Sequence, residues 1–295
     1  MGSQFSIKLV ETNKGRAAHM TGKAIAEIQR LEAKLSEFLP GSEVSKININ
    51  AGRNPVRLSE EVYQLLLQCQ YISEITDGAF DITTAAAKNL YNFDRNSHRH
   101  PSQQLVDQRS QIISYKYLHL DKTNYAFLQK PDSKISLAAI GKGLAADKAK
   151  DLLLDEGIES GVINASGDIA AWGANLEGQP WWVGITNPDD NKQVLLKIPL
   201  RNRSISTSGN QYQFFTDDGI KYSHTLNPKT AKPLSGIKSV SIVHESATIS
   251  DALATAVNVM GAEKGIRFVN AMRNTSCIII NDQNEVFSSR DIEIN

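Results

Sequence analysis

The sequence predicts a protein of the α+β class, in which strands and helices are mixed in irregular order. Apolar residues recur at helical spacing in several segments of the first half of its 295 residues, whereas short apolar or alternating runs typical of strands dominate the second half. No internal repeat or low-complexity linker is visible. The length suffices for one large domain or two intimate lobes, and we expect a single domain over residues 1–295 with two closely packed lobes.

The first half of the chain is predicted to open with a strand and continue with helices. Residues 1–10 are typical of a first strand, and the spacing of apolar residues predicts a helix over residues 24–38. The segment 42–48 is polar and predicts turns. A second helix is expected to begin at Ser59, whose hydroxyl can cap it, and residues 77–81 form a turn with two carboxylates.

The centre of the chain contains the pattern of a strand that turns into a helix. Residues 135–139 predict a buried strand, Gly141-Lys142-Gly143 follows, and a helix runs from there to a stop at Gly157. Free N–H groups and the helix dipole at such a turn favour an anion, so the pattern suits a phosphate. It also satisfies a loose dinucleotide fingerprint, and a simple turn with a solvated lysine remains an alternative.

The second half is predicted to be rich in strands. These are expected over residues 161–164, 169–172, 181–185, 194–200, 204–207 and 239–243. Asp217-Asp218-Gly219 predicts a hairpin turn, residues 248–260 and 262–272 predict helices, and residues 277–280 form a closing hairpin with 286–287.

Composition excludes several classes of function. The 32 basic and 32 acidic residues balance, which argues against nucleic acid or an anionic membrane as the main partner. No apolar run is long enough to span a membrane. No signal peptide is visible, and removal of a leader is compatible with a chain that opens on a strand. Cys69 and Cys277 lie in apolar segments and are expected to be buried thiols, with a disulfide between them left open.

Asp251 and Thr255 form a candidate metal site. Four residues apart on a helix, they share a face, so a carboxylate and a hydroxyl can converge on one point. Hard oxygen ligands completed by backbone carbonyls and phosphate oxygens suit Mg²⁺. The alternative is that Asp251 only stabilises the beginning of its helix.

Other candidate residues are less specific. His224 is expected on a strand before a turn that contains proline, as a buried core histidine, a donor to a phosphate or a proton carrier. Residues 207–210 form a turn or a small-residue wall for a flat ligand. His98 and His100 could bind a metal, but no third ligand is near, so a solvated loop is favoured.

Eight short blocks follow one another along the chain. They are Met1-Gly2-Ser3, Ser36–Pro40 with Ser42–Asn48, Gly78-Ala79-Phe80-Asp81, Ala139-Ile140-Gly141-Lys142-Gly143 with Asp147, Asn164-Ala165-Ser166-Gly167-Asp168, Thr207-Ser208-Gly209, Ser223–Thr230 and Asp251-Ala252-Leu253-Ala254-Thr255. In this order the blocks resemble the motifs of the ApbE family, the FAD:protein FMN transferases, over nearly the whole chain.

The resemblance implies a two-lobed, T-fold-related fold with mostly antiparallel sheets flanked by helices. It implies an enzyme that binds FAD and Mg²⁺ and transfers FMN to a threonine or serine hydroxyl of a partner redox protein, releasing AMP. It also implies a periplasmic or other extracytoplasmic location, with membrane contact only through an N-terminal lipid anchor. The chain contains no acceptor motif of its own, so the acceptor is expected to be another protein.

The resemblance also assigns residues. It implies that FAD is lined by Met1, Phe38, Ala79, Phe80, Asp81, Ser136, Lys142 and Leu226. It implies that Mg²⁺ is held by Asp251, Thr255 and the backbone oxygen of Ala139, with Ala254 beside them. His224 matches a histidine near the diphosphate, and we expect His224, Lys142 and Asp251 to carry the chemistry.

Three residues depart from the family pattern. Ser136 stands where the family usually has aspartate, while Ser166 and Ala231 stand where it usually has glycine. The alternative within the family's chemistry is Mg²⁺-dependent hydrolysis of FAD to FMN and AMP, with water as the acceptor. A flavin-binding protein without activity is favoured if Ser136 weakens catalysis. A nicotinamide-dependent dehydrogenase fits the glycine pattern alone, but the chain lacks repeated βαβ units.

Overall fold

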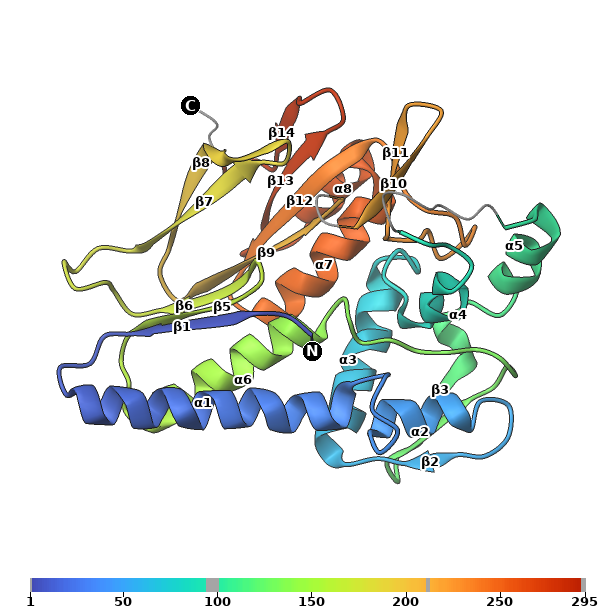
Figure 1. The fold of residues 1–295 in the computed structure, drawn as a ribbon, viewed down its shortest axis with the longest axis horizontal. Helices are drawn as coiled ribbons and strands as arrows, with labels where there is room; N and C mark the ends of the chain where they lie inside the picture. The colour runs from blue at the N-terminus through green and yellow to red at the C-terminus, as the bar shows by residue number, and fades with distance from the viewer. Residues whose placement is uncertain (1, 94–100, 211–212, 293–295) are drawn as a thin grey trace.

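The computed structural model describes residues 2–93, 101–210 and 213–292, and an antiparallel sheet of seven strands forms its centre (Figure 1). Its strand order is β1-β5-β6-β9-β12-β13-β14. The strands are β1 (Phe5–Leu9), β5 (Gly161–Ala165), β6 (Asp168–Trp172), β9 (Arg203–Gly209), β12 (Ile237–His244), β13 (Ser276–Asn281) and β14 (Val286–Ser288). Every pairing of neighbours is antiparallel. The predicted α+β class is confirmed. The described residues do not form the parallel sheet that binds dinucleotides, so the dinucleotide interpretation of the glycine pattern is wrong.

Helices cover one face of this sheet. They are α1 (Lys14–Leu35), α6 (Gly141–Asp155), α7 (Ala247–Met260) and α8 (Ala262–Asn270). Figure 1 shows α6 between the sheet and the long α1, which packs against it. A two-stranded ribbon, β7 (Trp181–Asn187) and β8 (Asp190–Leu200), covers the other face. Because side chains alternate along a strand, Ala170 and Ile279 join the helix-side core and Ala171 and Ile280 the ribbon-side core.

The remaining elements pack beside this sandwich. They are α2 (Glu43–Ile49), α3 (Glu60–Ile75), α4 (Ala85–Lys88), α5 (Gln103–Ser110), the 3₁₀ turns η1 (Ile82–Thr84) and η2 (Tyr115–Tyr117), the small sheet β2 (Val56–Arg57), β4 (Tyr125–Leu128) and β3 (Leu118–Leu120), and the hairpin β10 (Phe214–Asp217) and β11 (Ile220–Ser223). The division of the chain into two lobes stays a prediction.

The predicted helices exist, but the first begins earlier than expected and the second is not capped by the expected hydroxyl. The first helix begins at Lys14, ten residues before the predicted start, because the side chain of Asn13 caps it by accepting from the Arg16 N–H. The second begins after Ser59 as predicted, but the Ser59 hydroxyl donates to Glu43 at 2.8 Å instead of capping the helix.

The predicted turn over residues 42–48 is a helix, α2. Ser42 caps it by accepting from the backbone N–H of Ser45 at 2.9 Å, and Val44 and Ile47 are buried. The prediction was wrong because these two apolar side chains are only three residues apart, which is one helical turn within an otherwise polar segment.

The predicted strand over residues 135–139 is an irregular segment. The side chain of Asn48 accepts from the Ile135 N–H at 2.8 Å and donates to the Ile135 carbonyl at 3.0 Å. The Ser136 N–H donates to the Ile82 carbonyl at 2.9 Å. These partners replace a strand ladder, so Ile135, Ser136 and Leu137 are buried without being part of a sheet.

The two cysteines and the hairpin turn agree with the predictions, whereas the position of His224 differs. Cys69 and Cys277 are free, buried thiols. The hairpin turn lies at Asp218 and Gly219, both with positive φ. His224 follows the last residue of β11 instead of lying within a strand. No helix of the described chain has the length and apolar character that crossing a membrane requires. His98 and His100 lie outside the described residues.

Candidate active site

A cavity of about 1190 Å³ brings together segments from both halves of the chain. Most residues expected to line FAD or the metal lie in its wall. These are Phe38, Ala79, Phe80, Asp81, Ser136, Ala139, Lys142, His224, Leu226, Asp251 and Thr255. Met1 lies outside the described residues, but Gly2 and Ser3 line the cavity. Ala254 is 1% exposed and its methyl group packs in the hydrophobic core, so its side chain supplies no ligand.

A cluster of three charged side chains lies where α6 and α7 reach the cavity. Lys142 in the first turn of α6 forms an ion pair with Asp168, the first residue of β6. Asp251 lies on α7, and its carboxylate interacts electrostatically with both. Asp168 and Asp251 are 1% and 6% exposed. The local sequence around Asp168 does not indicate this ion pair, because the contact depends on the packing of α6 against β6.

Burial controls the electrostatics of this cluster. Burial and then the neighbouring Asp168 raise the pKa of Asp251, and burial also raises the pKa of Asp168. Burial alone would lower the pKa of Lys142, but attraction to Asp251 and Asp168 outweighs it and raises that pKa. When all three groups are ionised, two negative charges face one positive charge. The cluster therefore favours an additional cation.

The beginning of α6 is not the free anion site that its glycines predicted. The Gly143 N–H donates to Oδ2 of Asp251 at 3.0 Å, and the Gly141 N–H donates to the Leu137 carbonyl at 2.7 Å. Asp251 therefore supplies the negative charge that the N-terminus of α6 attracts. A Cβ on Gly143 would lie 2.1 Å from the carbonyl oxygen of Ala247, so glycine is required for the close approach of the two helices.

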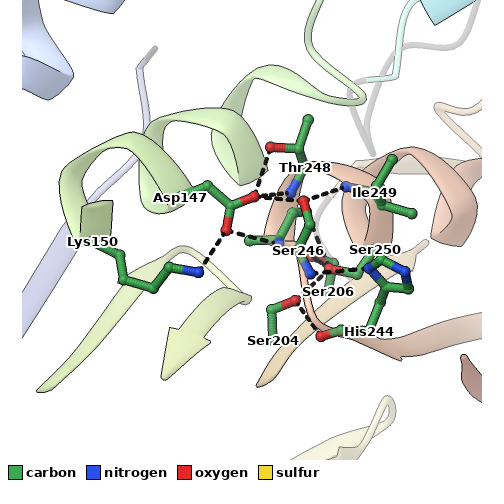
Figure 2. Close-up of polar contacts among 10 residues, drawn as sticks. Asp147, Lys150, Ser204, Ser206, His244, Ser246, Thr248, Ile249 and Ser250 are labelled. Carbon is green, nitrogen blue, oxygen red and sulfur yellow. Dashed lines mark hydrogen bonds and ion pairs between the residues drawn. The ribbon is translucent and has the colours of Figure 1, made fainter. Parts of the chain in front are cut away.

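Asp147 makes the reverse contact, in which a carboxylate on α6 holds the beginning of α7, as Figure 2 shows. Its carboxylate, on α6, accepts from the backbone N–H groups of Ala247 and Thr248 at 3.0 and 2.9 Å. It also accepts from the hydroxyls of Ser246 and Thr248 at 2.6 and 2.8 Å. Each helix thus begins on a carboxylate of the other, and this exchange positions Asp251 at the cavity.

The imidazole of His224 reaches the cavity with hydrogen-bonding capacity. Its Nδ1 is buried and has no hydrogen-bond partner among the residues that the structure describes. Burial lowers the pKa of His224, and the positive charges of Lys88 and Lys142 lower it further. A neutral imidazole with an unused nitrogen can accept or donate one hydrogen bond to a ligand.

Phe38 and Asp81 both lie in the cavity wall, but only the side chain of Phe38 is available to a ligand. Phe38 is 85% exposed and lines the cavity, so its ring is accessible to a flat ligand. Asp81 is committed to the fold, because it accepts from Thr83 at 2.8 and 2.6 Å and from the Tyr115 N–H at 2.7 Å. Burial raises its pKa.

The donor set of the cluster is compatible with Mg²⁺. The described residues contain no group of three or more histidine, cysteine, aspartate or glutamate side chains arranged to hold a metal. Mg²⁺ often takes one or two carboxylates and completes its shell with water and substrate phosphates. The Asp251 carboxylate and the Thr255 hydroxyl would supply two oxygen ligands. The excess negative charge of the cluster of Lys142, Asp168 and Asp251 would attract the cation.

A family model described as the ApbE family matches residues 1–279. The chain belongs to the ApbE family. Among its curated relatives, the FAD:protein FMN transferase of Salmonella typhimurium is 29% identical over 271 residues, which cover 90% of this chain and 77% of the relative. The enzyme of the same name from Vibrio cholerae is 29% identical over 279 residues, which cover 92% and 82%.

Solved structures of ApbE proteins have the same fold. The ApbE protein of Thermotoga maritima is 28% identical, with a TM-score of 0.90 over 98% of this chain and 94% of the other. The apo form of the Pseudomonas stutzeri flavinyl transferase ApbE is 26% identical, with a TM-score of 0.86 over 98% and 92%. The mostly antiparallel ApbE-like fold is therefore confirmed.

The departures from the ApbE motifs have structural consequences. Ser166 and Ala231 adopt positive φ values of 54° and 55°, a conformation that glycine adopts more readily. Ser136 donates through its hydroxyl to the Glu37 carboxylate at 2.5 Å. Glu37 is not predicted as a site residue, because nothing in its local pattern indicates that it meets a residue 99 positions away.

Proposed function

We propose that this protein transfers the FMN part of FAD to a serine or threonine hydroxyl of an acceptor protein in an Mg²⁺-dependent reaction. The acceptor oxygen forms a bond to the phosphorus of the FMN phosphate, the bond from that phosphorus to the bridging oxygen breaks, and AMP leaves. The hydroxyl proton is released. The observation that carries the proposal is the cluster of Lys142, Asp168 and Asp251 at a cavity of about 1190 Å³ in a member of the ApbE family.

The residues of the cavity match what this reaction needs. Breaking a diphosphate requires that negative charge be stabilised on the leaving phosphate. The ammonium of Lys142 and the imidazole of His224 both line the cavity and can donate to phosphate oxygens. Asp168 orients Lys142 through their ion pair, and burial on β6 keeps that carboxylate in place.

The metal ligands in this proposal are the Asp251 carboxylate, the Thr255 hydroxyl and the backbone oxygen of Ala139. All three residues line the cavity. When bound, Mg²⁺ would supply positive charge to the diphosphate oxygens. The hydrogen bond from Gly143 holds one carboxylate oxygen of Asp251 in a fixed direction, which limits the reorganisation that binding requires.

The proposal is tested by incubating the protein with FAD, Mg²⁺ and a flavin-acceptor domain, and measuring the intact mass of the acceptor. A mass gain of one FMN that EDTA abolishes is the expected result. AMP release without labelling of the acceptor would instead indicate an FAD pyrophosphatase, and FAD bound but unchanged would indicate a flavin-binding protein without activity.

Two further parts of the proposal rest on the family resemblance. We propose that the acceptor is a redox protein and that this protein works outside the cytoplasm, attached to the membrane by a lipid anchor. Peptide mapping of the labelled acceptor would identify the hydroxyl that carries FMN. Fractionation of cells would test the location, and recovery in the cytoplasmic fraction would contradict it.

A further inference from the structure

A second polar group, made of Glu37, Lys88 and Ser136, lies in the wall of the same cavity. The Ser136 hydroxyl donates to Oε1 of Glu37 at 2.5 Å, and Nζ of Lys88 lies 3.3 Å from the Ser136 hydroxyl and 3.9 Å from Oε1 of Glu37. Ser136 is 6% exposed, and the side chain of Glu37 is 19% exposed. These residues come from three separate segments, and none of them belongs to the Lys142 cluster.

The backbone that carries Glu37 is held in place. The hydroxyl of Ser45 donates to the Glu37 carbonyl at 3.0 Å, and the hydroxyl of Ser42 donates to the Ser36 carbonyl at 2.5 Å. Both serines lie at the beginning of α2 and are buried. The carboxylate of Glu37 is therefore presented to the cavity from a fixed main chain.

Glu37 is adjacent in sequence to Phe38, whose exposed ring lines the same cavity. An exposed aromatic face suits stacking with a flat heterocycle. A carboxylate can accept about four hydrogen bonds, so the bond from Ser136 leaves capacity for a ligand donor. Both flat rings of FAD carry N–H donors at their edge, the amino group of adenine and the imide of the flavin.

We infer that Glu37 is a positioning residue that accepts a hydrogen bond from an N–H group of the FAD ring stacked on Phe38. Ser136 orients the carboxylate, and Lys88 balances its charge. This inference rests on the proposed function, because it takes FAD as the ligand. It assigns recognition of the ring to a group separate from the Lys142 cluster, which faces the diphosphate.

The test compares binding of FAD by wild type and Glu37→Ala, measured by the change in flavin fluorescence. Loss of a hydrogen bond to a charged acceptor predicts binding weaker by about 10- to 100-fold. KM for FAD should rise accordingly, with little change in kcat. Competition by ADP and by FMN identifies the ring, because only the fragment that contacts Glu37 loses affinity. Glu263→Ala, an 82% exposed glutamate on α8, is the matched control and should bind as wild type does.

Moving the carboxylate from residue 37 to residue 136 distinguishes a direct role of Glu37 in FAD binding from a structural role. In the Glu37→Ala background, Ser136→Asp places a carboxylate in the space that Glu37 vacates, and it should restore binding. In the wild-type background the same change puts two carboxylates side by side and should weaken binding. Opposite effects in the two backgrounds support the inference, and equal effects contradict it.

The outcomes also separate this inference from the proposed function. If wild type does not bind FAD, the proposed function fails. If wild type binds FAD and Glu37→Ala binds it equally well or more tightly while remaining folded by thermal unfolding, the inference alone is overturned.

Discussion

The backbone N–H of Gly143 donates a hydrogen bond to the carboxylate of Asp251 at 3.0 Å, across the contact between α6 and α7. This contact joins a residue of the glycine-lysine-glycine motif to the predicted metal ligand 108 positions later. It exists because α6 and α7 approach so closely that Gly143 has no room for a side chain. The stability of the helix pair and the geometry of the site therefore depend on the same contact.

Gly143→Ala should destabilise the protein. Its Cβ would lie 2.1 Å from the Ala247 carbonyl oxygen and 2.9 Å from Cβ of Asp251, so the helices must separate. Overpacking of this kind costs about 1–3 kcal/mol or more, measured by urea unfolding. Gly141→Ala is the control, because its Cβ would meet only Leu137 at 4.0 Å. Equal stability of the two variants would contradict the prediction.

Asp147→Ala should also destabilise the protein and lower its activity. The change leaves the N–H groups of Ala247 and Thr248 and two hydroxyls without the acceptor that Figure 2 shows, at a cost of roughly 2–4 kcal/mol in the free energy of unfolding. Activity should fall because α7 carries Asp251. Lys150→Met removes the 3.4 Å ion pair to Asp147 but leaves the hydrogen bonds of Asp147 to α7 in place, and it should change stability by less than about 1 kcal/mol.

Asp251→Asn should separate activity from stability. Loss of the charge that would bind the cation should lower the rate of FMN transfer at least ~100-fold. The raised pKa of the buried Asp251 means that the folded state resists its ionisation. Wild-type stability should therefore fall as pH rises from the ordinary aspartate range through that raised pKa. The asparagine variant lacks this loss, so at pH 8 without Mg²⁺ its melting temperature should equal or exceed that of wild type. A much lower melting temperature would contradict the assignment.

Ser166→Gly should be more stable than Ser166→Ala by about 1 kcal/mol. Both variants lose the hydrogen bond from the Ser166 hydroxyl to the Gln4 carbonyl, measured at 3.0 Å. They differ in the strain of a Cβ at φ 54° in the two-residue turn between β5 and β6. Urea unfolding of the pair isolates that strain, and identical midpoints would show that the turn tolerates the Cβ.

Glu61 should contribute stability that acid removes. Arg30 donates to both of its carboxylate oxygens at 2.8 and 2.7 Å, and Lys34 adds a third bond at 2.9 Å. These bonds lower the pKa of Glu61 from 4.5 to about 2, and the bonds from Arg30 have the largest effect. Glu61→Gln should therefore cost about 1 kcal/mol at pH 6, and the difference should shrink as pH falls from about 4.5 toward 2. A difference that stays constant over that window would contradict the assignment.

Much of the fold could be predicted from local pattern. The strands of the second half and the helices over residues 141–155 and 247–260 follow from apolar periodicity, which depends on neighbours a few positions apart. The errors have two causes, a distant hydrogen-bond partner in one segment and a weak local pattern in another. Asn48 holds the run at Ile135 outside any sheet, and two apolar side chains in a polar segment are enough to make α2 a helix.

The sequence alone identified Lys142, His224 and Asp251 as candidates and showed the resemblance to the ApbE motifs, since these residue types carry their chemistry wherever they lie. Only the tertiary structure showed that Asp168 pairs with Lys142, that Asp251 caps α6, and that Glu37 meets Ser136. Such contacts depend on the pairing of strands and on the packing of helices far apart in the chain. Charge compensation, burial and hydrogen-bond direction are properties of that arrangement, and no local pattern contains them.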